Sequence, residues 1–354
     1  MRRRGTLAFL AITPILIGGL GVRAHLRAPV VRAAQTWAVQ VGADVDLNNG
    51  VTANAYFPGA ITVDAGDTVS WTFPALIPHT VTFDNGVVPP LAATGIVPDP
   101  GSGGADATAA INPVPTSGPP AAFDPKLQIS SGVPLDPPDE RTPFTLSFSQ
   151  PGLYHYTCAI HGSAMGGTVT VLPAGAALPE TSAQATGRGK AELAGAVGGT
   201  VGFFQANPAV TVGASPTSSI HAVTAGAASG DGVSLLQFLA KDITVRRGDT
   251  VSWTVADPAE IHTITFLSGG PDPEFLSVVP QANGSPKFIF PANVVGPAGG
   301  TTYTGQGYLN SGFIFDGGSF AVRIDAPPGK YDYLCLIHAT GFPYNMKGTI
   351  TVTQ

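Results

Sequence analysis

Short runs of alternating apolar and polar residues recur along the chain and predict β-strands. The clearest runs lie in residues 61–72, 165–171, 243–254 and 346–352. A two-residue period is typical of strands with one buried face, whereas an amphipathic helix has apolar residues three or four positions apart. Few segments rich in Leu or Glu have such a helical period. We therefore expect an all-β protein.

The strand patterns occur twice, in the same order. The matching pairs are Ile61–Thr72 with Ile243–Thr254, His79–Phe83 with His262–Phe266, Pro151–His161 with Pro328–His338, and Met165–Val171 with Met346–Val352. In the third pair, PGLYHYTCAIH corresponds to PGKYDYLCLIH. A weaker match joins Trp37–Gly42 to His221–Gly226. An internal repeat of this kind indicates two copies of one structural unit.

The repeat predicts two tandem β-sandwiches with Greek-key connections, in residues 35–173 and 219–354. Residues 174–218 are rich in Ala, Gly, Ser and Thr and are expected to form a linker with a short helix near 191–196. Each copy also contains a long loop insertion, 84–142 and 267–318, which we expect to decorate one end of its sandwich. The 45 Gly and 33 Pro fit a chain with many turns and loops.

Residues 1–34 have the features of a targeting segment. Arg2, Arg3 and Arg4 precede an apolar stretch, and small residues ending at Ala24 or Ala33 offer cleavage sites. We predict a signal peptide or a membrane anchor. The protein is therefore expected outside the cytoplasm, in the periplasm or the extracellular space, attached to the membrane if the leader is retained.

The charge balance narrows the choice of partners. Charged residues make up 11% of the chain, and its formal net charge is −6. Removal of the leader takes away six arginines and no acid, which leaves a net charge of −12. An acidic protein of this kind argues against nucleic-acid binding, which needs clustered Lys and Arg. It is compatible with a basic protein partner.

Cys158 and Cys335 are the only cysteines. In an exported chain, two cysteines normally suggest one disulfide. Here both occur in a Cys-x2-His sequence at the same place in the repeat, which favours the same chemistry in each copy over a bond between them. The plain alternative is that each Cys is a small buried residue and each His an ordinary loop residue.

A copper ion that alternates between +1 and +2 is well served by a thiolate, two imidazoles and a weak axial thioether. The chain contains this combination twice, once in each repeat. The first set is His79, Cys158, His161 and Met165, and the second is His262, Cys335, His338 and Met346. Apart from Met1, these are the only methionines. We therefore predict one mononuclear copper site in each domain.

Both halves resemble the plastocyanin/azurin-type cupredoxins, the blue type 1 copper proteins, in the pattern GDTVSW, His, YxYxCxxH and Met. The resemblance covers the framework strands but not the leader, linker or insertions. It implies a cupredoxin-like fold and makes the four residues of each set the copper ligands. Two departures stand out. The interval from His338 to Met346 is longer than that from His161 to Met165, and Thr80 or Thr263 stands where the family often has Asn.

The two threonines have two interpretations. A Thr hydroxyl can form a hydrogen bond across the ligand loops and so orient a metal ligand. It can equally be an ordinary strand residue.

The remaining histidines and the tyrosines near the cysteines are expected to have structural roles. His155 lies on the opposite strand face from Cys158 and should be exposed. His221 aligns with Trp37 at a strand start and is interpreted as structural. The four tyrosines that share the strand parity of the cysteines are expected in the core: Tyr154, Tyr156, Tyr331 and Tyr333.

The function expected from these features is one-electron transfer between exported redox proteins, with no catalytic residue. His161 and His338, on loops expected to be exposed, would be the exit points for electrons. A copper carrier or storage protein remains an alternative. A multicopper oxidase or nitrite-reductase-like enzyme is another, but it needs further histidines, and the chain has no His-x-His sequence. Besides the ligands and the leader, only His155 and His221 remain.

Overall fold

A computed structural model describes residues 32–83, 95–109, 115, 121–205, 211–214, 219–282, 286–342 and 344–354. All of the predicted leader except residues 32–34 lies outside this part of the chain, as do parts of the linker and of both insertions. The described residues form mainly β-strands, as the alternating pattern predicts.

The first half is a sandwich of two sheets. One sheet has the order β2 (Val51–Phe57), β1 (Thr36–Asp46), β4 (Thr68–Thr72), β10 (Phe144–Ser147) and β8 (Ala121–Ala122). The other has the order β3 (Ala60–Asp64), β12 (Gly162–Leu172), β11 (Gly152–Cys158), β5 (Thr82–Phe83) and β9 (Ile129–Ser130).

The second half repeats this arrangement strand for strand. One sheet has the order β15 (Val233–Leu239), β14 (Ser219–Ala228), β17 (Thr250–Ala256), β23 (Ser319–Ile324) and β21 (Thr302–Tyr303), and β13 (Thr211–Ala214) adds to β14. The other has the order β16 (Asp242–Arg246), β25 (Lys347–Thr353), β24 (Gly329–Leu334), β18 (Thr265–Phe266) and β22 (Leu309–Asn310). The sequence repeat is therefore also a repeat of topology.

Each sandwich core contains a tryptophan of the repeated Val-Ser-Trp sequence. Trp71 and Trp253 are fully buried. Their rings lie edge-on to Tyr156 and Tyr333, with ring centroids 5.4 and 5.3 Å apart. Aromatic pairs of this geometry contribute about 0.5–1.5 kcal/mol beyond the area they bury. The same contact thus fixes the cysteine strand, β11 or β24, against the opposite sheet in both halves.

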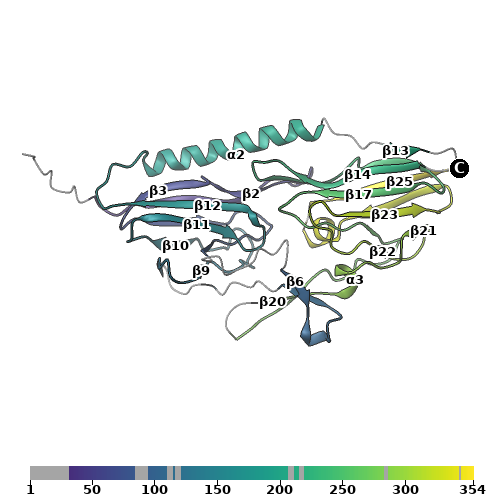
Figure 1. Ribbon diagram of the computed structural model, residues 1–354, viewed down its shortest axis with the longest axis horizontal. Coiled ribbons are helices and arrows are strands. Elements are labelled where there is room, and N and C mark those ends of the chain that lie inside the picture. The colour runs from purple at the N-terminus through teal and green to yellow at the C-terminus, as the bar shows by residue number, and fades with distance from the viewer. Residues whose placement is uncertain are drawn as a thin grey trace, which may run out of the picture.

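The two sandwiches lie end to end and share one sheet (Figure 1). Strand β2 of the first half pairs antiparallel with β15 of the second, with Thr52 opposite Ser234. The sheet that contains β2 and the sheet that contains β15 therefore continue into one 11-stranded sheet. Because backbone hydrogen bonds cross the junction, the halves are joined by more than the chain connection.

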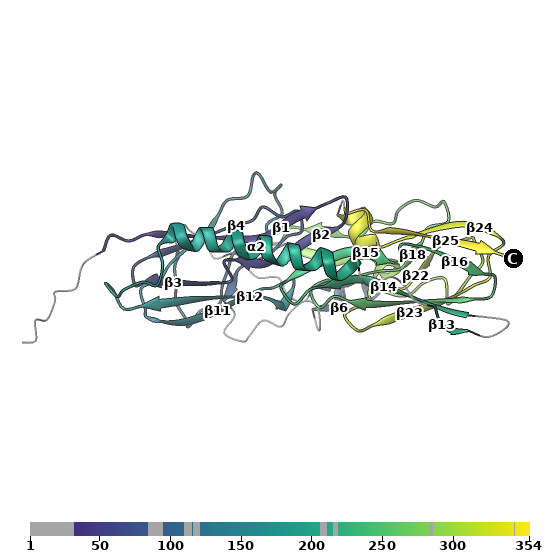
Figure 2. The same cartoon turned by 90° about the horizontal axis from the view of Figure 1, so that it is seen from above.

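The segment between the sandwiches contains a long helix instead of the short one predicted near 191–196. Helix α2 spans Ser182–Gln205 and lies along the shared sheet (Figures 1 and 2). Ala196 packs into a cluster with Phe57 of β2 and Val233 of β15. Near its first turns, Arg188 pairs with Glu180 and Glu192. The prediction placed a helix correctly but underestimated its length, because its Gly and Ala content resembles that of a flexible linker.

The two insertions pair with each other. Strands β6 (Ile96–Pro98) and β7 (Ala107–Ala109) of the first join β19 (Ser277–Val279) and β20 (Lys287–Phe290) of the second in one four-stranded sheet. The expectation that each insertion decorates its own sandwich holds for β8, β9, β21 and β22, which extend the sheets of their own halves, but not for this joint sheet. The Lys287 ammonium forms an ion pair with Asp99, and Thr108 Oγ1 donates to the Phe288 carbonyl at 2.7 Å. The short helical segments η1 (Pro100–Ser102) and α3 (Ala292–Val295) belong to these insertions.

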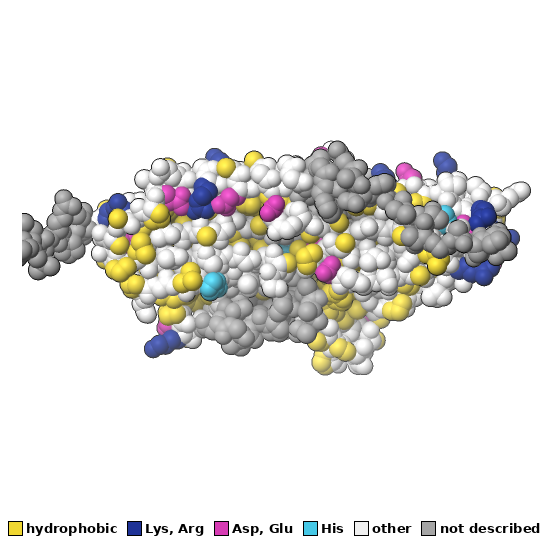
Figure 3. Space-filling model, turned by 45° about the horizontal axis from the view of Figure 1, so that its top comes forward, with side chains coloured by type: hydrophobic (Ala, Val, Ile, Leu, Met, Phe, Trp, Pro, Cys, Tyr) yellow, Lys and Arg dark blue, Asp and Glu magenta, His cyan; other side chains and the backbone are white. Residues whose placement is uncertain are grey.

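The surface carries few charges, in keeping with the composition. Charged side chains are scattered among apolar and neutral polar ones on the face shown in Figure 3. Among the described residues, no helix is both long and apolar enough to cross a lipid bilayer.

Candidate metal centres

The first candidate site lies at one end of the first sandwich. His79 lies between β4 and β5, Cys158 ends β11, and His161 follows in the turn to β12. The two His Nδ1 atoms are 3.1 Å apart, and Cys158 Sγ is 3.3 Å from His161 Nδ1. All three side chains are at most 2% exposed. The sequence places these residues up to 82 positions apart, and the sandwich brings them to one point.

The second candidate site has the same construction. His262 pairs with Ile314 in an isolated β-bridge, Cys335 follows β24, and His338 lies in the π-helical turn η2 (Ile337–Gly341). The His262 and His338 Nδ1 atoms are 3.2 Å apart, and Cys335 Sγ is 3.8 and 3.6 Å from them. None of the three side chains is exposed.

The donor atoms fit a single first-row metal ion in each site. Zinc is a first-row ion whose bonds are about 2.0–2.1 Å to an imidazole nitrogen and about 2.3 Å to a thiolate sulfur. Donor atoms that bind one ion of this size therefore lie roughly 3–4 Å from one another. In each triad the His nitrogens and the Cys sulfur lie within 4.8 Å of one another. One thiolate with two imidazoles is a donor set of blue-copper sites.

Part of the chain is similar in sequence to a curated protein. A scan of family models gives no match. Plastocyanin from Synechococcus sp. is 36% identical over 75 residues, which is 21% of this chain and 48% of plastocyanin. This chain therefore spans about half the length of the curated relative it matches. The chain has a cupredoxin-type fold.

Part of the chain is also similar to solved structures. Auracyanin from Roseiflexus castenholzii is 21% identical, with all of its chain and 40% of this one covered and a TM-score of 0.24. Plastocyanin from Dryopteris crassirhizoma is 25% identical, with 99% and 38% covered and a TM-score of 0.21. A purple cupredoxin from Nitrosopumilus maritimus is 18% identical, with 98% and 37% covered and a TM-score of 0.21.

The threonine after the first histidine links the ligand loops in both cupredoxin domains. Thr80 Oγ1 accepts a hydrogen bond from the Ala159 N–H at 2.7 Å, and Thr263 Oγ1 accepts one from the Leu336 N–H at 2.8 Å. The Thr80 N–H points at Cys158 Sγ at 3.3 Å. The predicted hydrogen bond across the ligand loops is therefore confirmed in both domains, whereas orientation of a metal ligand by it stays a prediction. The hydroxyl ties the His loop to the Cys loop.

The first histidine of each triad lies against a glycine that the repeat also aligns. A Cβ on Gly42 would be 2.3 Å from His79 Nε2, and one on Gly226 would be 1.9 Å from His262 Nε2. Both glycines have a positive φ, +68° and +67°. Glycine is required here because any side chain would displace the imidazole.

The two predicted axial methionines are buried in the same core clusters as the cysteines of their triads. Met165 is 1% exposed and lies in β12. Met346 is fully buried, its N–H donates to the His338 carbonyl at 3.2 Å, and its carbonyl accepts from the Cys335 N–H at 3.0 Å. The π-helical turn η2 thus accommodates the longer His338–Met346 interval. Coordination by the two thioethers stays a prediction.

Both cysteines are free thiols, so the disulfide alternative does not apply. Burial raises the pKa of the Cys335 thiol, but His338 and His262 lower it more, so that this pKa lies well below its usual value. Burial likewise opposes ionisation of Cys158, yet hydrogen bonding from His79 leaves its pKa lowered. The surroundings of each cysteine therefore favour the thiolate, which is the form that binds metal.

The histidines differ between the domains. Burial lowers the pKa of His79 and of His161. For His338, burial acts in the same direction, but the Cys335 thiolate and Glu260 outweigh it and raise its pKa to about 10. A metal ion at the second site would replace this proton, since a ligating imidazole nitrogen must be free.

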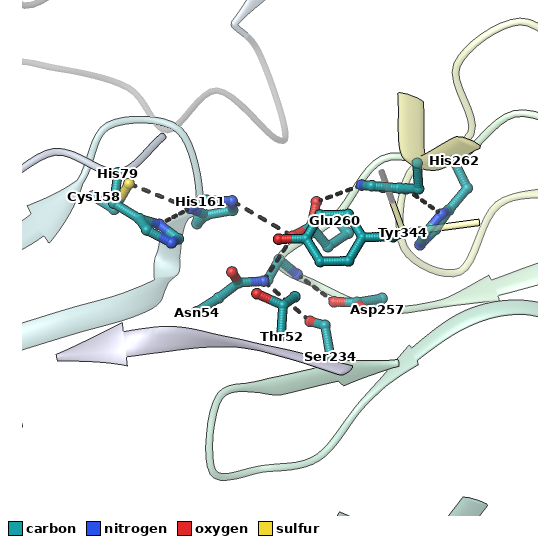
Figure 4. A network of polar contacts seen from close by, with 12 residues as sticks. Thr52, Asn54, His79, Cys158, His161, Ser234, Asp257, Glu260, His262 and Tyr344 are labelled. Atoms are coloured by element: carbon teal, nitrogen blue, oxygen red, sulfur yellow. Dashed lines mark hydrogen bonds and ion pairs between the residues drawn. The ribbon is translucent and has the colours of Figure 1, made fainter. Parts of the chain in front are cut away.

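Glu260 joins the two sites and was not predicted from the sequence. Its Oε2 is 3.2 Å from His338 Nε2, and its Oε1 is 3.6 Å from His161 Nε2 of the other domain (Figure 4). It is 7% exposed. Burial raises its pKa, but His338 and His161 lower it to about 2. One feature of the sequence could have pointed to Glu260. It stands two residues before His262, whereas the first copy has the apolar Ile77 two residues before His79.

His161 and His338 are themselves buried, at 2% and 0% exposure, with Glu260 against both rings, although Ser163 and Gly341 of the same loops are exposed. Other minor predictions are confirmed. His155 is exposed, His221 Nε2 lies 3.0 Å from Asp249 Oδ2, and Tyr156 and Tyr333 are buried. Tyr154 and Tyr331 are partly buried and pack against the two cores.

Proposed function

We propose that this chain is an exported protein with two blue-copper sites that transfers single electrons between redox partners. The observation that carries the proposal is the repeated triad of one buried Cys sulfur and two converging His nitrogens. The plastocyanin match supports copper as the metal. The proposed ligands are His79, Cys158, His161 and Met165 in the first domain, and His262, Cys335, His338 and Met346 in the second.

Copper, when bound, supplies the one-electron couple. The chain supplies rigidity. The ligand loops are held by Thr80 and Thr263, and the first histidines occupy the space that a side chain at Gly42 or Gly226 would fill. A donor set that keeps its positions in both oxidation states favours electron transfer, because little rearrangement accompanies each step. The burial of both triads also favours retention of copper over its delivery to another protein.

An apolar cavity of about 140 Å³ gives electrons a place to enter and leave. Its lining includes His161, Glu260 and His338, and otherwise mainly apolar side chains from both domains and both insertions, such as Ile160, Phe275, Phe290 and Phe342. Since the two histidines are the ligands nearest to this surface, a redox partner that docks over the cavity would face both sites.

Copper loading tests the proposal. The wild-type chain should bind two copper ions and show an intense blue thiolate-to-copper absorption with a reversible one-electron couple. Cys158→Ser and Cys335→Ser should each remove one copper and its share of the band. A colourless copper-loaded protein would contradict the proposal. Rapid loss of copper to a chelator, without a reversible couple, would favour the carrier function instead.

The enzyme alternative calls for further histidine ligands at the domain junction. His155 is exposed on β11, and His221 contacts Asp249 at the start of β14, so neither lies beside a triad. Turnover of a copper-oxidase substrate or of nitrite by the loaded protein would support that alternative.

A further inference from the structure

The two histidines of the Cys-x2-His loops, His161 and His338, belong to opposite domains and both contact the Glu260 carboxylate. Figure 4 shows His161 and Glu260 in this network. In each ring Nδ1 faces its own triad, whereas Nε2 faces Glu260. The contacts are 3.6 Å from His161 and 3.2 Å from His338. Glu260 thus connects the outer edges of two proposed copper ligands.

This carboxylate is held in place by the strands that join the domains. Asn54 of β2 donates from Nδ2 to Glu260 Oε1 at 2.7 Å and lies 3.2 Å from Ser234 Oγ of β15. Asn54 and Ser234 are fully buried. A buried carboxylate with hydrogen-bonding partners on both oxygens has one preferred position. Glu260 is therefore a fixed part of the junction.

A buried acid at this place is unexpected on energetic grounds alone. Burying a charge is unfavourable unless it is paired, and the apolar residue Ile77 occupies the equivalent position of the first domain. Asp257 is a second buried acid nearby, but the two oxygens of Glu260 are the ones that contact His161 and His338. The asymmetry of the repeat thus coincides with the one point where the two sites meet.

We propose that Glu260 is the bridge through which the two copper sites exchange an electron within one molecule. This inference rests on the proposed function. In the exchange, Cu(I) at one site becomes Cu(II) while Cu(II) at the other becomes Cu(I). One electron moves, and no atom or proton is transferred. Along this path from one imidazole ring to the other, the non-covalent steps are the two Glu260 contacts, of 3.6 and 3.2 Å.

Flash reduction of the full chain with two bound coppers tests the bridge. A photoexcited ruthenium complex delivers less than one electron per protein molecule. Absorption is then followed at wavelengths where the spectra of Cys158→Ser and Cys335→Ser differ, because there the two copper sites can be told apart. Wild type should show a redistribution phase whose rate is independent of protein concentration. The two single-site variants should lack it. Glu260→Leu should slow this phase at least tenfold, and Glu260→Gln by less.

Glu260→Gln is the decisive variant if Glu260→Leu loses copper, because it keeps the side-chain volume and an acceptor for Asn54. The matched control is Glu140→Gln, an exposed glutamate, which should leave the rate unchanged. An unchanged rate in the Glu260 variants, with both blue bands intact, would overturn the proposal. So would a wild type with two blue sites but no concentration-independent phase. Absence of the blue bands in wild type would instead contradict the proposed function.

Discussion

At the scale of single residues, both sites depend on small groups that leave or fix space around an imidazole or a thiolate. Gly42 and Gly226 leave room for the first histidine. Thr80 and Thr263 tie the histidine loop to the cysteine loop through one hydroxyl each. None of these residues is a proposed copper ligand, yet each decides where a ligand lies.

Replacement of Gly226 by alanine should disable the second site alone. The new Cβ would be 1.9 Å from His262 Nε2, so the ring must move away from Cys335. We expect about half of the blue absorption and one copper per chain to be lost. Gly307→Ala is the control, because its φ of +79° imposes similar backbone strain and nothing lies within 4 Å. Equal loss in both variants would show that strain, not contact with His262, is responsible.

Replacement of Thr80 by valine should weaken the first site without removing a ligand. The buried Ala159 N–H loses its acceptor, which lowers the free energy of unfolding by about 1–3 kcal/mol. Copper affinity of this site should fall roughly 10–100-fold, as for other groups that orient ligands. Denaturant titration and copper competition measure the two effects. Thr80→Ser should restore both, and a Ser variant as weak as Val would contradict the role of the hydroxyl.

At the scale of elements, the equivalent strands β1 and β14 each begin with a contact to a buried aspartate, but the side chain that makes this contact differs between them. Trp37 Nε1 of β1 donates to Asp67 Oδ2 at 2.8 Å, and His221 Nε2 of β14 lies 3.0 Å from Asp249 Oδ2. Asp249 also accepts from the Ser219 and Arg246 N–H groups. A buried aspartate therefore fixes the start of the strand, and the aromatic partner is interchangeable.

Asp249→Asn should destabilise the second domain in a pH-dependent way. Burial opposes ionisation of Asp249, but His221 and the two N–H donors lower its pKa below the usual 3.8. A lowered folded-state pKa stabilises the fold above pH 3.8, and this contribution is lost as pH falls through the folded value. At pH 7 the variant should lose about 1–3 kcal/mol of unfolding free energy. The difference from wild type should shrink in acid. Asp325→Asn, on the surface, should have a smaller effect.

At the scale of the whole molecule, the two domains form one body. The β2–β15 pairing, helix α2 and the paired insertions all cross the junction. Tyr344 of the second domain also donates to Asp44 of the first at 2.6 Å. These contacts determine how the two sites face each other and leave the donor triads separate.

Thermal unfolding of the full chain should therefore show one cooperative transition. Val233 is fully buried in the cluster between β2, β15 and α2. Val233→Asp places a charge there and should separate the unfolding of the domains into two calorimetric transitions. Two transitions already in wild type would contradict the single cooperative unit.

The features that could be predicted from the sequence are those carried by the internal repeat or by residues close together along the chain. Strand alternation gave the all-β class, and the matched segments gave two sandwiches with two equivalent His, Cys and His sets. The structure alone decided how the two units meet. Helix α2, the pairing of the insertions, the burial of His161 and His338, and the contacts of Glu260 all depend on groups distant in sequence. Alternation reports which face of a strand is buried, but not which partner buries it.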